Sequence, residues 1–235
     1  MPRRLVGELM DDPSLDAAQH AHALAGLARL NALSGVSRQF YRILAREASL
    51  VDRSLTIVDV ATGSADLPVA ILRQARRDGV SLRFTACDIS SVALAQARER
   101  AAKAGVELET RQLDILHEAP PPADVAMCSL FLHHLQDEYI RSVLGKMASA
   151  GRQVVISDLC RGPWGLALAA IIPRLVTRSR VVHVDAVRSV RAALTIGEAR
   201  SITRGIADES AWQIDRAFPA RMLIRWPASA STTRS

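Results

Sequence analysis

The sequence predicts an α/β fold with a doubly wound, mostly parallel sheet. From residue 55 onwards, short apolar runs alternate with longer helical patterns, which is typical of strand–helix repeats. The apolar runs are rich in β-branched residues and nearly continuous, as in strands that helices cover on both faces. The chain has 235 residues, of which 49% are hydrophobic, so it can bury a sizeable core.

Each element follows from its local pattern. Residues 1–50 are expected to form an N-terminal helical cap, because leucines and alanines build a broad apolar face over 21–33 and Asp12-Pro13 suits a helix start. Residues 51–235 are expected to form the main domain. Its strands are expected at 55–60, 82–87, 107–112, 124–129 and 153–158, and its helices at 67–78, 92–104 and 136–148.

Residues 161–204 break this alternation and are expected to form a helical lid or substrate segment within the main domain. The lid contains an apolar helix from Trp164, a basic segment and a helix near 197–206. Two final strands are expected at 212–218 and 221–226. Pro219 lies in the tight turn between them, which makes these two strands antiparallel.

The amino-acid composition indicates which partners and which cellular compartment to expect. Of the 30 basic residues, 28 are arginine, and the net charge is +6. These arginines are not interleaved with exposed aromatic residues, so we expect no nucleic-acid partner. Three cysteines without metal-ligand spacing, and an amino terminus without an apolar signal segment, favour a reducing cytoplasm.

The residues after the first expected strand indicate a ligand site. The strand runs into the loop Ala61-Thr62-Gly63-Ser64-Ala65, and a helix follows. Small residues let a ligand approach the backbone, and the first N–H groups of a helix are unpaired. A dinucleotide fingerprint requires three glycines around its pyrophosphate, and only Gly63 is present. The loop therefore favours an uncharged nucleoside with an amino-acid tail.

Aspartates stand at the ends of three successive expected strands. They are Asp59, Asp88 and Asp114, and ligands of open α/β sheets bind at this edge. Asp88 is spaced from Gly63 as a ribose-binding carboxylate would be, and Asp114 can accept a hydrogen bond from the amine of adenine. Singly, each could equally be a helix cap or a turn residue. Their recurrence favours a nucleoside site.

Residues 59–66 resemble the first motif of class I S-adenosyl-L-methionine (SAM)-dependent methyltransferases, and most closely that of the ubiquinone/menaquinone biosynthesis group, D-V-A-T-G-T-G-D. Residues 124–135 are similar to that group's fourth-strand motif, and Asn31, Ser34 and Gly35 resemble its N-x-x-S-x-G segment. The resemblance implies a Rossmann-like sheet of seven strands in the order 3-2-1-4-5-7-6, with strand 7 antiparallel. Ala65 departs from the usual third glycine, and 148–151 from the usual K-P-G-G turn.

The resemblance also implies SAM as the cofactor and a set of contacts to it. Ala61 and Gly63 would line the methionine moiety and Asp88 would hold the ribose. Ile89, Asp114 and Ile115 would surround the adenine. The full set is Asp59, Ala61, Thr62, Gly63, Asp88, Ile89, Asp114, Ile115, Ser129 and Leu130, with Ser129 and Leu130 beside the sulfonium.

Methyl transfer to oxygen also requires a base, for which a neutral histidine is suited near pH 7. His133 and His134 follow the fourth strand, and adjacent positions favour one of them facing the substrate. His183 and Asp185 would share a face of an extended segment, so Asp185 could orient His183. The alternatives are a backbone-bonded histidine at 133 or 134 and a solvated pair at 183 and 185.

The expected enzyme is a SAM-dependent methyltransferase of a small hydrophobic acceptor in secondary metabolism, phenolic, polyketide or quinone-like, with oxygen favoured. The alternatives are C-methylation of a quinone precursor and a catalytically silent SAM-binding partner protein. The apolar helix beside basic residues suits an acceptor lid, a buried helix or peripheral contact with anionic lipid. No metal-ligand cluster is apparent from the spacing. The oligomeric state stays open.

Overall fold

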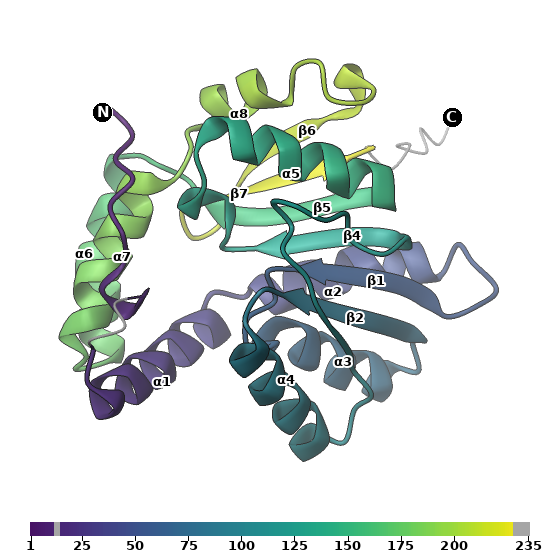
Figure 1. The fold of residues 1–235 in the computed structure, drawn as a ribbon, viewed down its shortest axis with the longest axis horizontal. Coiled ribbons are helices and arrows are strands. Elements are labelled where there is room, and N and C mark those ends of the chain that lie inside the picture. The colour runs from purple at the N-terminus through teal and green to yellow at the C-terminus, as the bar shows by residue number, and fades with distance from the viewer. Residues whose placement is uncertain (12–14, 228–235) are drawn as a thin grey trace.

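A computed structural model describes residues 1–11 and 15–227, and its centre is a seven-stranded sheet (Figure 1). The strand order is β3-β2-β1-β4-β5-β7-β6. Strands β1 to β5 are parallel, and β7 is antiparallel to β5 and β6. This order confirms the predicted fold class. The strands are β1 (Leu55–Val60), β2 (Leu82–Asp88), β3 (Glu109–Gln112), β4 (Ala123–Ser129), β5 (Gly151–Leu159), β6 (Gln213–Ala217) and β7 (Arg221–Trp226).

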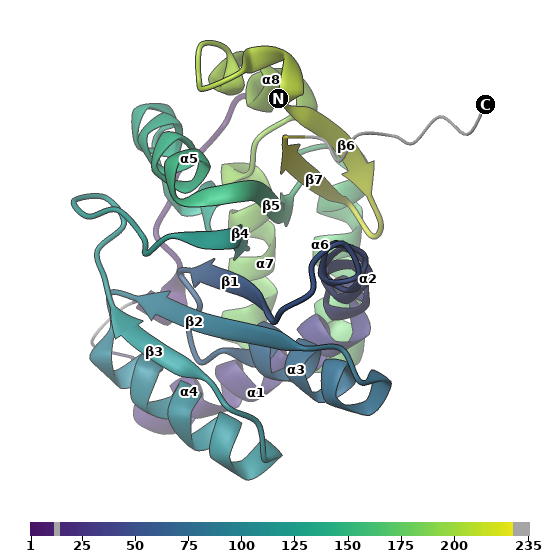
Figure 2. The same ribbon diagram turned by 90° about the vertical axis from the view of Figure 1, so that its right-hand side faces the viewer.

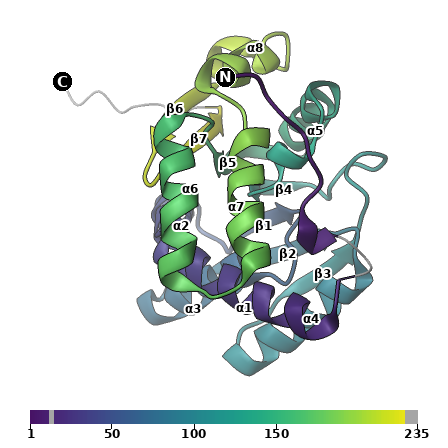
Figure 3. The ribbon, with the colours of Figure 1, turned by 90° about the vertical axis from the view of Figure 1, so that its left-hand side faces the viewer.

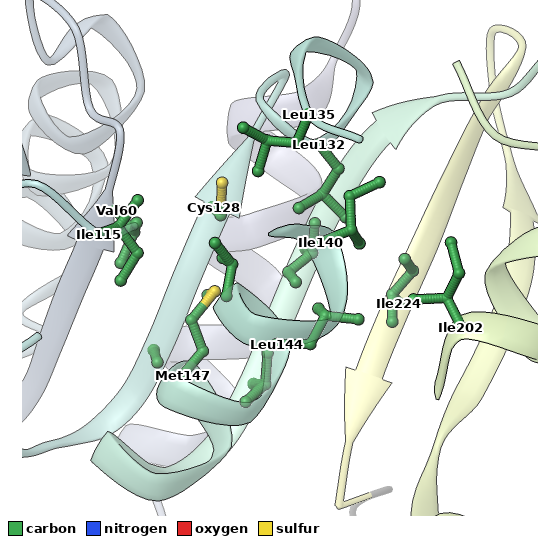
Figure 4. Packing of buried hydrophobic residues seen from close by; sticks show 14 of the residues in the cluster. Val60, Ile115, Cys128, Leu132, Leu135, Ile140, Leu144, Met147, Ile202 and Ile224 are labelled. Atoms are coloured by element: carbon green, nitrogen blue, oxygen red, sulfur yellow. The ribbon is translucent and has the colours of Figure 1, made fainter. Parts of the chain in front are cut away.

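Helices cover both faces of the sheet (Figure 2). One face carries α2 (Val36–Ala48), α3 (Asp66–Asp78) and α4 (Ser91–Ala104), and the other carries α5 (Asp137–Ala150) and α8 (Ile196–Thr203). Figure 4 shows residues of α5, among them Ile140, Leu144 and Met147, packed over the strands. The β-branched runs of the central strands are buried on both sides, which explains their continuous apolar character.

A third group of helices lies at one edge of the sheet (Figures 1 and 3). It comprises α1 (Ala17–Leu33), α6 (Pro163–Val176) and α7 (Arg180–Ala192). Helix α7 contacts the turn η2 (Leu132–His134), which follows β4, so the group covers the carboxyl edge of the strands. Helix α1 approaches the α6–α7 loop closely, because a Cβ at Gly26 would lie 2.8 Å from Oγ1 of Thr177. The group therefore closes over the edge where a ligand would bind.

Two expectations for these segments are wrong. Residues 1–8 are not helical, and only Leu9–Asp11 form a short helical turn, η1. Residues 180–192 are a helix rather than extended chain. Their valines favour strand locally, but burial of Val181, Val182 and Val190 stabilises the helix. The helix start expected at Asp12-Pro13 lies outside the described residues, and the N-cap of α1 is Asp16.

Candidate active site

The loop from β1 to α3 holds three residues in the left-handed region. The φ angles are 55° at Ala61, 58° at Gly63 and 56° at Ala65. Glycine adopts this region freely, whereas the Cβ of alanine crowds the following carbonyl oxygen. The backbone is held by hydrogen bonds from Thr62 N to the Cys87 carbonyl (3.0 Å) and from Ala65 N to the Thr62 carbonyl (3.1 Å). The loop is therefore a strained, preorganised turn at the sheet edge.

Asp88, the last residue of β2, fixes this loop. Its Oδ2 accepts from Gly63 N at 2.7 Å, and its Oδ1 accepts from Ser90 N at 2.9 Å. Each carboxylate oxygen has further lone pairs, so Asp88 can still accept hydrogen bonds from a hydroxyl group. The same carboxylate thus organises the glycine loop and is available to a ligand.

A cavity of about 710 Å³ opens between this loop, the end of β4 and helix α1. This volume is within the range of small-molecule sites. Leu27 and Asn31 of α1 form one wall, and Gln96 and Arg100 of α4 contribute to another. The cavity brings together six of the ten residues expected to bind SAM, which are Asp59, Ala61, Thr62, Gly63, Ser129 and Leu130.

Asp59 places a buried carboxylate at this cavity. It is 3% exposed, and its Oδ2 accepts from Oγ1 of Thr62 at 2.6 Å. Burial, opposed by the Thr62 hydrogen bond and assisted by the neighbouring Asp88 carboxylate, raises the pKa of Asp59 to about 7. A cation bound beside Asp59 would favour its ionised form. The group is therefore suited to the ammonium of an amino-acid tail.

The three residues expected around the adenine differ from one another in exposure and in hydrogen bonding. Ile89 is exposed and free to cover a flat ring. Asp114 accepts from Leu116 N at 2.9 Å, which is the turn role that the sequence left open for it. Ile115 is buried in the main core cluster. The described lining of the cavity includes none of these three residues or Asp88.

A second cluster, the His133 cluster, lies directly beyond the end of β4 and consists of His133, Asp158, Glu8 and Ser189. His133 Nδ1 lies 2.7 Å from Oδ1 of Asp158, which ends the buried part of β5, and its Nε2 lies 3.7 Å from Oε1 of Glu8. The Ser189 hydroxyl on α7 donates to the same Glu8 oxygen. Both His133 and Asp158 are almost completely buried.

The charges in the His133 cluster compensate one another. Burial alone would lower the pKa of His133, but Asp158 and Glu8 outweigh it and raise this pKa to about 9. Burial would likewise raise the pKa of Asp158, but His133 lowers it, with a further contribution from the buried Arg221. The cluster therefore holds an imidazolium between two carboxylates at neutral pH.

Glu8 reaches this position because long-range contacts hold the amino-terminal segment. The Arg3 guanidinium donates to the carbonyls of Leu135 (2.7 Å) and Ala192 (2.6 Å). The buried Asp185 carboxylate accepts from Leu9 N (2.7 Å) and Met10 N (3.0 Å). Asp185 therefore fixes the segment and does not orient His183, because these residues point to different sides of a helix.

The other histidine candidates have different surroundings. His183 Nε2 lies 2.8 Å from the Thr177 carbonyl, at the loop before α7. His134 is exposed, and its ring centroid lies 4.2 Å from that of His133. Glu8, His133 and His134 each bring one potential ligand atom within 4.8 Å of the others, a grouping that sequence spacing did not reveal.

Sequence reasoning missed Asp158 and Glu8 as site residues. Asp158 ends the predicted fifth strand, so the criterion that selected Asp59, Asp88 and Asp114 would also have selected it. Glu8 has no such signal. It meets His133 only because the chain returns across α7, and residues 125 positions apart cannot be paired by local pattern.

Residues 57–153 match the family model of a methyltransferase domain. The matched region contains the β1–α3 loop, Asp88, and the end of β4 that lines the cavity. The chain therefore contains a methyltransferase domain, and the protein is an enzyme with SAM as its cofactor. A comparison with curated proteins found no match.

Solved structures share the fold at low sequence identity. The magnesium protoporphyrin IX methyltransferase of Synechocystis, with bound SAH, is 15% identical with a TM-score of 0.58, covering 91% of this chain and 88% of that one. An O-methyltransferase family 2 protein from Planctomyces limnophilus, in complex with apigenin, is 21% identical with a TM-score of 0.61, covering 91% and 62%. The plantazolicin methyltransferase BamL is 15% identical with a TM-score of 0.64, covering 85% and 73%. This chain thus spans less than two thirds of the family 2 protein.

Proposed function

We propose that the protein transfers the SAM methyl group to an oxygen atom of a small hydrophobic acceptor, phenolic, polyketide or quinone-like. The observation that carries this proposal is the buried His133–Asp158 pair. His133 lies three residues beyond Leu130, which lines the cavity. Methyl transfer from a sulfonium is an in-line displacement, so the chain mainly positions the two reactants. A hydroxyl acceptor must also lose a proton, and His133 is the group that would take it.

The cofactor would lie with its methionine moiety against the β1–α3 loop, its ammonium beside Asp59 and its ribose toward Asp88. SAM supplies the electrophilic methyl group. Asp158 orients the imidazole through Nδ1, so that Nε2 is the atom available for proton transfer. Glu8 covers that atom, so the acceptor must displace the Glu8 carboxylate to reach it.

The pH dependence of turnover tests this assignment. His133 is protonated below its pKa of about 9, so the rate with a phenolic acceptor should rise with pH up to that value. Glu8→Gln removes one of the charges that raise the pKa, so the rising limb should move to lower pH with the same acceptor. If the rate rises over the same pH range in the unaltered protein and in Glu8→Gln, the proposed role of His133 is wrong.

One other reaction is separated by product analysis. C-methylation of a quinone precursor, which the motif resemblance favours, would give a methylated ring carbon instead of an ether. Binding of SAM in calorimetry without conversion of any of a panel of phenolic, polyketide and quinone-like acceptors would contradict the proposed acceptor class. These neighbours are named for, or were solved in complex with, magnesium protoporphyrin IX, apigenin and a plantazolicin analog, and this range supports a small-molecule acceptor without selecting one.

A further inference from the structure

Helix α6 presents its large apolar side chains outward. Trp164, Ile171 and Leu175 are 69%, 56% and 77% exposed, and Ile172 is 39% exposed. Together with the half-buried Leu168 they recur every three or four residues, so they form one stripe along the helix. The stripe, called here the α6 stripe, is about 17 Å long at the helical rise of 1.5 Å per residue.

The opposite face of α6 explains why the stripe is left outside. Gly165, Ala169 and Pro173 are buried there. A Cβ at Gly165 would lie 2.9 Å from the Cys160 carbonyl oxygen and 3.3 Å from Cγ1 of Val190 on α7. The small residues therefore make the intramolecular contact with α7. This arrangement reverses the usual surface helix, in which the large apolar residues face the core.

The surroundings of the α6 stripe are basic. Residues 163–184 contain no acidic residue, and neither do residues 17–46, which include α1 packed against α6. Arg174, Arg178 and Arg180 are exposed around the carboxyl end of α6. Within the described residues, no helix is long and apolar enough to cross a membrane. A helix of this kind, apolar outward and flanked by arginine, is suited to lie in a lipid–water interface.

We propose that the α6 stripe docks the protein onto a membrane surface that contains anionic lipid. Trp164 would sit at the headgroup level, where tryptophan is enriched, and the three arginines would contact lipid phosphates. A second copy of the chain is a poorer occupant. A two-fold contact through this stripe would join two basic surfaces, and residues 163–184 offer no acidic side chain to pair with the arginines of the other copy.

Flotation of the full-length protein with lipid vesicles tests the proposal. Vesicles of mixed phosphatidylglycerol and phosphatidylcholine should carry the protein, vesicles of phosphatidylcholine alone should carry much less, and added salt should weaken binding. Ile171→Ser with Leu175→Ser should reduce the bound fraction on anionic vesicles at least tenfold. Leu50→Ser, at a 70% exposed position outside the stripe, is the matched control and should bind like the unaltered protein.

Two results would overturn the proposal. One is absence of flotation with anionic vesicles. The other is equal binding by the double variant and the control. Light scattering tests the competing occupant, a second copy of the chain. If the unaltered protein is a dimer, the double variant is a monomer and neither binds lipid, the stripe would be assigned to a contact between copies. Calorimetry with SAM should give the same affinity for the double variant and the control, which separates this surface from the methyl-transfer site.

Discussion

Asp59 and Asp158 are the penultimate residues of β1 and β5, and both are almost fully buried, yet their pKa values move in opposite directions. Asp59 has a hydroxyl partner and a neighbouring carboxylate, so burial dominates and its pKa rises to about 7. Asp158 faces His133 and Arg221, and these cations lower its pKa. The comparison teaches that Asp59 has no cationic partner among the described residues, so a ligand can supply one, whereas Asp158 already has its counter-charge within the fold.

The two sides of the site also differ in how they are assembled. The donor side is built by the loop between β1 and α3 with Asp88, from segments that are near neighbours in the chain. The proposed acceptor side is the His133 cluster, which joins Glu8, His133, Asp158 and Ser189 from four distant segments. Changes on the acceptor side should therefore affect global stability, and changes on the donor side should affect cofactor binding.

The largest expected effect comes from Asp158→Asn. It leaves the His133 and Arg221 cations buried without their carboxylate, so the free energy of unfolding should fall by about 3–5 kcal/mol. Urea denaturation measures this loss. Asp215→Asn removes an exposed carboxylate that pairs with Arg225 and should cost less than about 1 kcal/mol. Equal losses for the two variants would contradict the difference between buried and surface charges.

The next effect is the pH dependence of stability. Because folding raises the pKa of His133 from its ordinary value near 6.5 to about 9, its contribution is complete below pH 6.5 and is lost as pH rises through 9. The loss should be on the order of 3 kcal/mol, measured by urea denaturation at a series of pH values. His133→Gln should flatten this part of the profile. An unchanged slope would show that another group is responsible.

Asp88→Ala tests the donor side. The substitution removes both the support of Gly63 N and the carboxylate expected to hold the ribose, so SAM affinity should fall tenfold or more, or about 1.5–3 kcal/mol. Isothermal titration calorimetry measures it. Asp52→Ala, at an exposed position in the turn before β1, should bind SAM normally. Unchanged affinity in Asp88→Ala would defeat the ribose assignment.

SAM binding should also depend on pH through Asp59. An ammonium beside it favours the ionised carboxylate, so affinity should rise as pH increases toward its pKa of about 7 and level off above. Below that value the change approaches about tenfold per pH unit, because binding is coupled to release of one proton. Asp59→Asn should abolish this dependence. A dependence that persists in the variant would point to a different proton.

The smallest effect concerns the two left-handed alanines of the β1–α3 loop, Ala61 and Ala65. Ala61→Gly should relieve backbone strain and stabilise the protein by up to about 1 kcal/mol. Ala65→Gly should gain less, because the buried Ala65 methyl group packs with Val69 and Ala86, and its loss costs about 0.8 kcal/mol. Thermal unfolding compares the two variants. A larger gain for Ala65→Gly would mean that strain outweighs packing at that position.

Sequence reasoning performed best where one segment contains the whole structural signal. The strand at 55–60 was predicted with its observed bounds, and most other elements of the sheet domain were predicted to within a few residues. It failed at 180–192, where β-branched residues are held in a helix by tertiary burial. It also failed at residues 1–8. The course of this segment depends on the contact of Arg3 with the Ala192 carbonyl and on contacts that Arg188 and Asp185 make with Gly7 and Leu9.

By itself, the sequence determined the alternating α/β architecture, the small-residue loop after the first strand and the aspartates at the strand ends. These features arise from residue periodicity, backbone propensity and the common edge of parallel strands, which act over short distances along the chain. Only the tertiary structure decided that Glu8 and Asp158 enclose His133 and that α6 turns its large apolar residues outward. Both outcomes depend on which surfaces meet after the chain has folded, and that is set by packing between distant segments.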